Sequence, residues 1–400
     1  MKVLQIGTTD KRGGAAAISW QLKEAMEAKG WKTSMFVADK HSKDPSVKVI
    51  PRSFLARVAS FLLANDDFFS TDWILKTPEY KEAGIVHCHN LHGRYFNLKT
   101  LSKMAKEKPV IWTLHDEWAI TPHCAYTFEG SKIENGFYQC QSKETPPRIF
   151  WHNERYLAWR KKFLYKKTPM TIVTPSRWLY DRVKKSVLAE KQIELIYNGI
   201  DETVFFPQNR EACRELLGLP KEKRIVLVLA DGGTGNPWKG WKYARKVAES
   251  FISNSEVLFL SVGNEIQKEE GNIRYLGLVN DPKLLAQYYC AADVLLYTSL
   301  ADNFPLVILE AMACGLPIVS FDVGGVKEAV LEGENGIIAS YLNTDGLVNG
   351  LKHMFLLPQN QIAGMKNKCR ERVLDRFTSS KMLKQYFELY ENVFEKHNRQ

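Results

Sequence analysis

The chain has 400 residues, 45% of them hydrophobic and 12% aromatic, and a formal net charge of +10. This length and composition exclude a disordered chain and favour two domains of similar size. No apolar run approaches the roughly 20 residues of a membrane span, and the first residues lack the features of a secretory signal, so we expect a cytoplasmic protein.

The first half of the chain alternates strand-like and helix-like segments. KVLQIG is followed by the glycine-bearing turn TTDKRGG and by a helical pattern, AAAISWQLKEAMEAKG, that ends at a capping Gly30. Further strand-like runs are KTSMFVA, GIVHCH, PVIWTLHD and TIVTPS. This alternation predicts a doubly wound, mostly parallel α/β sheet, whose ligands gather at the carboxyl ends of the strands. His89, His115 and Ser176 lie at such ends.

The segment HCHNLHG places three histidines close together, His87, His89 and His92. Alternation along a strand would let His87 and His89 share one face of the sheet. Three metal ligands from such a segment are not favoured, and we predict no metal site.

The seven cysteines are scattered along the chain, and no two of them form a CxxC pair. We therefore expect free, reduced thiols, as in most cytoplasmic proteins. A pairing of Cys124 with Cys140 is the alternative that stays open.

Positive charge is concentrated in the first half of the chain. Residues 1–200 carry 32 Lys and Arg against 20 Asp and Glu, while residues 201–400 carry 23 against 25. This excess favours a polyanionic partner, although a solvated helical face would give the same composition. The segment RIFWHNERYLAWRKKFLYKK, residues 148–167, interleaves aromatic and basic side chains, and residues 52–63 are a second amphipathic candidate. Both are typical of helices on an anionic membrane surface, and of helices packed within the domain.

The strand and helix alternation restarts after residue 206. RIVLVLA, VLFLSVG, IRYLG, VLLYTS and PIVSFD read as strands, with helices between several of them. We predict two Rossmann-like domains facing one another across a cleft, residues 1–206 and 207–378. An amphipathic helix at about 379–400 is expected to pack back on the first domain.

The second domain opens on a glycine-rich loop, LADGGTGNPWKGW, at residues 229–241. Backbone N–H groups of this loop, the positive end of the next helix and Lys239 would favour phosphate oxygens. Glycines that simply form a turn are the alternative. The loop is neither a P-loop nor GxGxxG, which argues against an ATPase or a dehydrogenase.

The stretch DNFPLVILEAMACGLP, residues 302–317, contains two acids in an apolar setting. Asp302 is either a helix N-cap or a ligand residue, and Glu310 is either paired with a Lys or Arg or reserved for a ligand. Because both acids lie at the same edge of the sheet as the glycine-rich loop, they favour a site for a nucleotide sugar.

These motifs, in this order, resemble the retaining glycosyltransferases of family four with the GT-B fold, and especially the capsule and colanic-acid-type members. The Asp-x7-Glu of DNFPLVILE, followed by AMACGLPIVSFDVGG, resembles their Glu-x7-Glu motif. GGAA, WTLHDEW, HCAY, VTPSRWL, YNGID, WKGW, YLGLV and AADVLLYTS complete an ordered set that covers nearly the whole chain.

The resemblance implies roles for matching residues. Glu310 would hold the nucleotide ribose, Asp302 a hydroxyl of the donor sugar, and Lys239 the diphosphate. His115 would contact the donor sugar, and with Asp302 and Lys239 it forms the expected catalytic set. The other expected donor contacts are Gly14, Gly233, Thr234, Gly277, Val279, Asn303, Phe304 and Leu306, and the expected acceptor contacts are Gly13, Gly14 and His89.

The implied reaction moves a sugar, with retention, from a nucleotide-diphosphate sugar to a hydroxyl of a saccharide or lipid-linked acceptor in surface polysaccharide synthesis. UDP is the expected nucleotide, no metal or other cofactor is expected, and no nucleic acid is an expected partner. The protein would be cytoplasmic, with possible contact to the inner face of the membrane. The alternatives are a UDP-sugar epimerase of the same fold and a non-catalytic nucleotide-sugar or polyanion-binding protein.

Two departures from the family pattern bear on these expectations. Asp302 is one methylene shorter than the usual glutamate, and LADGG stands where many members have a Gly-Arg pair.

Overall fold

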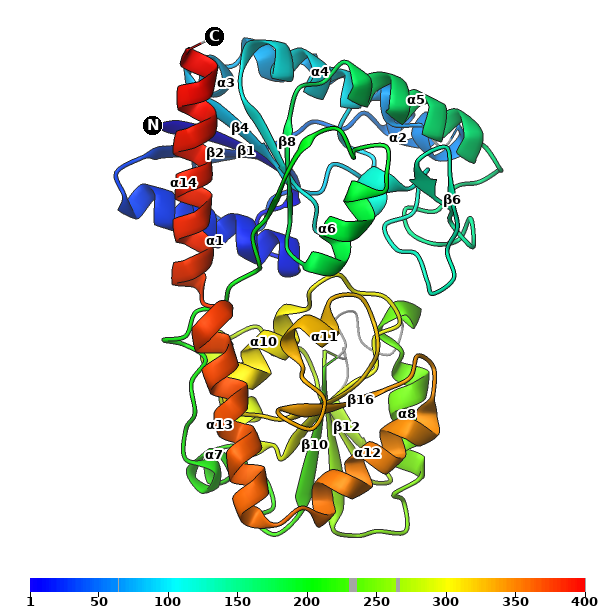
Figure 1. Ribbon diagram of the computed structural model, residues 1–400, viewed down its shortest axis with the longest axis vertical. Helices are drawn as coiled ribbons and strands as arrows, with labels where there is room; N and C mark the ends of the chain where they lie inside the picture. Colours follow the sequence, from blue (N-terminus) through cyan, green and yellow to red (C-terminus); the bar gives the residue numbers. More distant parts are fainter. Residues whose placement is uncertain (64, 230–235, 264–266, 400) are drawn as a thin grey trace. The chain divides into compact units, whose positions relative to one another are not determined.

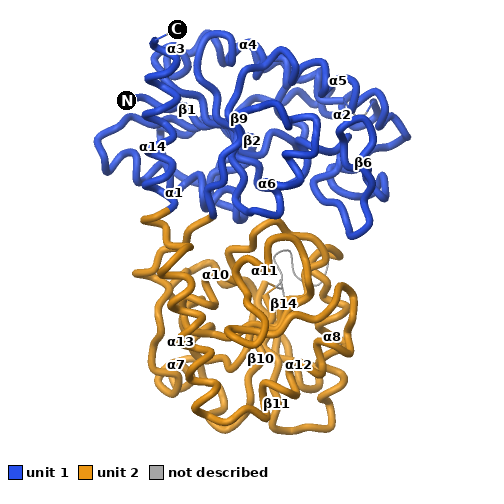
Figure 2. Tube along the Cα trace, in the orientation of Figure 1, with its two compact units in different colours: residues 1–197, 382–400 blue, residues 198–381 orange. Residues whose placement is uncertain are grey.

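A computed structural model describes residues 1–63, 65–229, 236–263 and 267–399. The chain forms two compact units (Figure 2): unit 1 contains residues 1–197 and 382–400, and unit 2 contains residues 198–381. Each unit is built around one sheet with helices on its faces (Figure 1).

Unit 1 contains a seven-stranded sheet in the order β3-β2-β1-β4-β5-β8-β9, and every neighbouring pair is parallel. Its central strands are apolar and buried, as expected when helices cover both faces of a parallel sheet. The strands are β1 (Lys2–Thr9), β2 (Lys32–Asp39), β3 (Val47–Val49), β4 (Ile85–Cys88), β5 (Val110–Thr113), β8 (Thr171–Thr174) and β9 (Gln192–Leu195).

The helices of unit 1 are α1 (Gly14–Ala28), α2 (Phe54–Leu63), α3 (Pro78–Glu82), α4 (Leu98–Glu107), α5 (Glu154–Lys166), α6 (Arg177–Lys184) and most of α14 (Ser379–Asn398). Short 3-10 turns are η1 (Asp66–Phe68), η2 (Asp72–Lys76) and η3 (Trp118–Ile120). The C-terminal helix α14 packs on unit 1, because the Phe387 ring lies 5.3 Å from that of Trp31 and the Tyr390 hydroxyl lies 2.7 Å from His87 Nδ1. Among the described helices, none is both long and apolar enough to cross a membrane.

Unit 2 contains a second seven-stranded sheet in the order β12-β13-β11-β10-β14-β15-β16, parallel except for the β12–β13 pair. Its strands are β10 (Arg224–Leu229), β11 (Val257–Val262), β12 (Gln267–Glu270), β13 (Ile273–Leu276), β14 (Val294–Tyr297), β15 (Ile318–Phe321) and β16 (Gly336–Ala339). Its helices are α7 (Arg210–Leu216), η5 (Pro237–Lys239), α8 (Trp241–Glu249), α9 (Pro282–Ala291), α10 (Leu306–Ala313), α11 (Val326–Ala329), α12 (Thr344–Leu356) and α13 (Gln359–Arg376).

The division between the units falls earlier than the predicted residue 206. The segment 198–206 belongs to unit 2, because Asn198 donates to the Phe304 carbonyl at 3.3 Å and Arg370 donates to the Phe205 carbonyl at 2.6 Å. Gly199 passes so close to the Thr378 carbonyl that a Cβ there would meet its oxygen at 2.4 Å.

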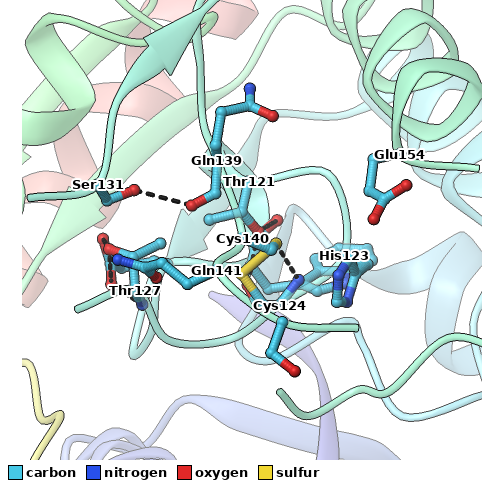
Figure 3. The surroundings of a disulfide bond; sticks show 12 residues. Thr121, His123, Cys124, Thr127, Ser131, Gln139, Cys140, Gln141 and Glu154 are labelled. Carbon is cyan, nitrogen blue, oxygen red and sulfur yellow. Dashed lines mark hydrogen bonds between the residues drawn. A yellow bond between two sulfur atoms is a disulfide. The ribbon is translucent and has the colours of Figure 1, made fainter. Parts of the chain in front are cut away.

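The expectation that all cysteines are free is wrong for one pair. Cys124 and Cys140 form a disulfide with Cα atoms 6.0 Å apart (Figure 3), while the other five thiols are free and buried. The short hairpin of β6 (Ile133–Glu134) and β7 (Phe137–Tyr138) lies between the two cysteines and reverses the chain. This reversal returns Cys140 to Cys124, which the spacing in the sequence does not reveal.

Candidate functional site

Asp302 and Lys239 form an ion pair in unit 2. Lys239, the last residue of η5, donates to Asp302 Oδ2 at 2.9 Å, and the Tyr297 hydroxyl donates to the same oxygen at 2.6 Å. Asp302 Oδ1 accepts from the backbone N–H of Asn303 at 3.0 Å. The N-cap role considered for Asp302 is wrong, since α10 begins after Pro305 without a side-chain cap. Asp302 therefore holds Lys239 in place at the end of β14.

Glycines bring the loops around this ion pair into contact. Gly240 follows Lys239 with φ 66°, and a Cβ there would lie 1.9 Å from the Thr298 carbonyl oxygen. Gly324 has φ 53°, and its Cβ would lie 1.8 Å from the Asp302 carbonyl oxygen. Only glycine combines this conformation with so close an approach, so both positions fix the backbone that presents Asp302 and Lys239.

Glu310 lies on α10 in a different environment from Asp302. Its neighbours Leu309 and Ala311 are buried, whereas Glu310 is partly exposed and accepts a hydrogen bond from the Tyr289 hydroxyl at 2.9 Å. Among the described residues, no Lys or Arg forms an ion pair with Glu310. The pairing with a basic side chain that was considered from the sequence is therefore not found. The packed surroundings of its carboxyl group disfavour the charged form and raise the pKa of Glu310 to about 7. A carboxylate supported by one neutral hydroxyl retains acceptor capacity for a ligand.

The remaining predicted donor contacts of unit 2 lie on three segments. Asn303 and Phe304 are buried just before α10, where the Phe304 ring packs 5.2 Å from that of Phe377, and Leu306 is the first residue of the helix. Gly277 follows β13 with φ 78°, and Val279 is partly exposed two residues later. The predicted contacts at Gly233 and Thr234 lie outside the described residues.

In unit 1, Gly13 and Gly14 form the start of α1. Gly13 has φ 85° and is the N-cap, with no side-chain hydrogen bond and no acid in the first turn of the helix. Both glycines are exposed, and a Cβ at Gly13 would meet no atom within 4 Å. The first N–H groups of α1 therefore lie at an exposed helix end, which favours an anion.

His115 and His89 are joined by a hydrogen bond at the carboxyl ends of β5 and β4. His89 Nδ1 lies 2.9 Å from His115 Nε2, and His89 Nε2 lies 3.1 Å from Gln5 Oε1. Both ring nitrogens of His89 are thus used inside unit 1, and the residue is only 2% exposed. The expected contact of His89 with the acceptor substrate is therefore not supported. Burial lowers the pKa of His115 to about 4, so its imidazole is neutral at physiological pH.

His87, the other histidine considered as a ligand, is fully buried beneath α14. Its ring nitrogens lie 2.7 Å from the Tyr390 hydroxyl and 2.8 Å from Thr113 Oγ1. His92 lies 2.6 Å from an Asp116 carboxylate oxygen instead. Within the described parts of the chain, no group of His, Cys, Asp and Glu is arranged to hold a metal ion.

Sequence patterns missed the residues that support the site. Tyr297 ends β14 and so carried a weak signal, because ligands gather at the carboxyl ends of parallel strands. Tyr289 lies inside the apolar run of α9, where nothing in the sequence separates it from a core residue. Gly240 and Gly324 were visible only as members of longer glycine-containing motifs.

Comparison with protein families gives two matches along the chain. Residues 12–204 match the family model described as Glycosyltransferase Family 4, and residues 225–355 match Glycosyl transferases group 1. A curated relative, the putative colanic acid biosynthesis glycosyl transferase WcaC of Escherichia coli (strain K12), is 26% identical over 98% of this chain and 100% of its own. An uncharacterized 41.2 kDa protein in the cps region of Klebsiella pneumoniae is 24% identical, with the same coverage of both chains.

Solved structures share the fold over nearly the full length. Sucrose-phosphate synthase from Thermosynechococcus elongatus superposes with a TM-score of 0.75 and 18% identity, covering 99% of each chain. Anabaena Alr3699/HepE, in complex with UDP-glucose, gives a TM-score of 0.69 and 17% identity, covering 98% of this chain and 100% of its own.

Proposed function

The chain belongs to the glycosyltransferase family of these two models and has the GT-B fold, and from this membership we propose that it transfers a sugar from a UDP-sugar. The proposed acceptor is a hydroxyl of a saccharide or lipid-linked saccharide in surface polysaccharide synthesis, and the anomeric configuration is retained. The relatives named for colanic acid synthesis and for a cps region support the pathway class, and the UDP-glucose complex of a fold neighbour supports the donor.

The observation that carries this proposal is the Lys239–Asp302–Tyr297 arrangement at the entry to α10. Breaking the bond between the sugar and the diphosphate leaves negative charge on the leaving group, and a fixed cation stabilises that charge without reorganising. Asp302 fixes Lys239 through an ion pair of 2.9 Å, so the ammonium is already oriented. The N–H groups in the first turn of α10 would add to this stabilisation.

Each remaining residue has a proposed part. Glu310 accepts the ribose hydroxyls, while the segment Gly277–Val279 faces the base. The neutral imidazole of His115 hydrogen-bonds a hydroxyl of the donor sugar, and the N-terminus of α1 at Gly13–Gly14 approaches the phosphates and the acceptor. We propose that these protein groups suffice without a metal or other cofactor.

A panel of donors tests the proposed function. We expect one UDP-sugar to raise the melting temperature, because a ligand at 100 times its Kd adds about 2.7 kcal/mol to stability. GDP- and ADP-sugars should have smaller effects in the same thermal-shift assay. Transfer to an added saccharide, unchanged by EDTA and absent without acceptor, supports a transferase. Conversion of the donor alone would indicate an epimerase, and binding without either product a non-catalytic protein.

We also propose that unit 1 contacts the inner membrane surface through an α2–α5 face. This face consists of the exposed apolar side chains of the two helices and of the segment just before α5: Phe54, Leu55, Val58, Leu62, Leu63, Phe150, Trp151, Tyr156, Trp159 and Phe163. α2 and α5 lie side by side (Figure 1), since Asn65 donates to the Tyr156 hydroxyl and Asn153 to the Leu63 carbonyl. Packing within the domain does not account for the apolar side chains of α2, because Ser60 is the only buried residue of this helix.

Vesicle sedimentation tests this contact. The double variant Leu55→Ser with Trp159→Ser is expected to bind phosphatidylglycerol vesicles at least about tenfold more weakly, because burial of each apolar side chain contributes roughly 1.5–3 kcal/mol. The matched control is Leu356→Ser, since Leu356 is 83% exposed in unit 2 and Leu55 is 76% exposed. Equal sedimentation of all three proteins, or equal binding to phosphatidylcholine vesicles, would contradict the proposal.

A further inference from the structure

Unit 1 contains a cavity between α2, α5 and the loops that precede and follow β6 and β7. Its lining includes Ser60 of α2, Arg160 and Lys161 of α5, and residues 147–149. The space open to the centre of a water molecule is about 50 Å³, enough for several waters or one small tetrahedral anion.

The charge of this lining is strongly positive. Four cationic side chains line it, Arg94, Arg148, Arg160 and Lys161, against one carboxylate, that of Asp66. Arg160 is paired with the carboxylate of Asp67, and Arg148 lies 3.7 Å from a carboxylate oxygen of Glu144; neither acid is part of the lining. The remaining two cations, Arg94 and Lys161, exceed the single lining acid, so the cavity favours an anion.

Lys161 supplies the first specific requirement for such an anion. It is 2% exposed and donates to the carbonyl oxygens of Trp118 and Thr121 at 2.5 and 3.0 Å. Among the described residues, no carboxylate lies within ion-pair distance of its ammonium. Burial lowers the pKa of Lys161 well below its usual range, and the neighbouring Arg160 adds to this effect, so a bound anion would stabilise the charged form of the side chain.

His123 supplies a second, independent requirement. Its ring is 3% exposed, Nδ1 lies 3.1 Å from the Pro147 carbonyl, and Nε2 is buried without a hydrogen-bond partner in the described structure. The Nδ1 atom must donate to the carbonyl, so the neutral ring leaves Nε2 as an acceptor for a phosphate hydroxyl. A protonated ring would donate from Nε2 to a phosphate oxygen.

The negative charge of Asp66, the one acid that lines the cavity, is weakened by its surroundings. Asp66 accepts a hydrogen bond from Ser60 Oγ at 2.7 Å, and burial raises its pKa. Its repulsion of an anion is weakened accordingly. Arg94 and Arg148 both lie over the Phe61 ring of α2, at 4.6 and 5.7 Å from its centre. The Phe61 ring lies 6.0 Å from that of Phe150, so these cations adjoin the apolar α2–α5 face.

We propose that the cavity binds the phosphate group of a phosphorylated amphiphile, through Lys161, His123 and Arg148, while the apolar chain lies along the α2–α5 face. The cations account for the phosphate, and the adjoining exposed apolar side chains account for the chain. The identification of this ligand with the acceptor rests on the proposed function, because a lipid-linked acceptor contains both parts. The binding itself needs neither donor nor turnover.

Calorimetric titration of the full chain with decyl phosphate, below its micellar concentration, tests the proposal. We expect saturable binding, and a Kd at least about tenfold higher for Lys161→Met, because the variant loses a charge-assisted hydrogen bond from a buried group. The control Lys162→Met removes the same charge from the next, exposed residue of α5 and should stay within about twofold. Inorganic phosphate should compete with decyl phosphate but bind more weakly, and decyl glucoside should not compete.

A second pair of variants guards against misfolding of Lys161→Met. Arg148 has a side chain that is 60% exposed, so Arg148→Gln is expected to fold normally and to weaken decyl phosphate binding by about three- to tenfold. Arg155→Gln, an exposed change on α5, is its control.

The outcomes separate the two proposals. Equal affinity of all four variants, or equal binding of decyl glucoside, would overturn the phosphate site. Inorganic phosphate binding as tightly as decyl phosphate would replace the amphiphile with a free anion. Loss of transfer in a protein that still binds decyl phosphate would contradict the proposed function and leave the site intact.

Discussion

Replacing Lys239 by methionine is expected to lower kcat for sugar transfer by about 10²- to 10³-fold, the effect of removing one fixed donor from a developing negative charge. Methionine preserves the length of the side chain, so the loss comes from the charge. Tyr297 still donates to Asp302 at 2.6 Å, which keeps the carboxylate satisfied and the loop in place. Steady-state kinetics with saturating acceptor would measure the change.

The control for this variant is Lys246→Met. Lys246 is exposed in the last turn of α8, so this substitution removes the same charge from the same unit, away from the site. Its kcat should stay within about twofold of wild type. If Lys239→Met instead raised KM and left kcat unchanged, Lys239 would bind the donor equally in ground and transition states. That result would contradict the role proposed for it.

Glu310→Gln is expected to weaken donor binding at pH 8 by about tenfold or more while stabilising the free protein. The loss of affinity follows from replacing an ionised acceptor, whose hydrogen bonds contribute roughly 1.5–3 kcal/mol, by a neutral amide. With a pKa of about 7, the ionised fraction of Glu310 rises about tenfold from about pH 6 to about pH 8. Wild-type donor affinity should therefore rise over this interval, and the variant should lose that pH dependence.

The stability of the unliganded protein should change in the opposite direction. The folded-state pKa of Glu310 lies above its ordinary value of 4.5, so its contribution to stability is fully present below about pH 4.5 and is lost as pH rises through about 7. Glutamine stays neutral, so the variant should match wild type near pH 4.5 and be more stable at pH 8, by on the order of 1 kcal/mol.

Thermal unfolding and titration with the best UDP-sugar, both across this pH range, measure the two effects. Glu371→Gln is the matched control, because Glu371 is exposed on α13 and should show neither effect. Unchanged donor affinity in Glu310→Gln at every pH would make the carboxylate a purely structural partner of Tyr289.

Local patterns in the sequence were sufficient for the architecture. Apolar runs such as RIVLVLA alternate with helical segments, and this alternation predicts parallel strands because each crossover requires a helix between them. The same patterns placed His89 and His115 at the carboxyl ends of strands, where the structure joins them by a hydrogen bond. They also marked Lys239, Asp302 and Glu310 as candidate site residues, but did not indicate which side chains these residues contact.

Contacts between distant segments could not be predicted. Lys239 and Asp302 lie 63 residues apart in sequence and meet because β10 and β14 are neighbours in the sheet, while Tyr289 reaches Glu310 because α9 packs beside α10. Ring closure by Cys124 and Cys140 depends on a hairpin reversal in the same way.

The sequence by itself determined the elements, their alternation and the residue types at the strand ends, because backbone conformation and the period of apolar positions depend on neighbours along the chain. Only the tertiary structure decided which carboxylate holds a cation, which histidine is enclosed, and which apolar helix stays exposed. Those outcomes depend on strand order and helix packing, and the physical reason is that a hydrogen bond or an ion pair exists only when two separate segments present their atoms within about 3 Å.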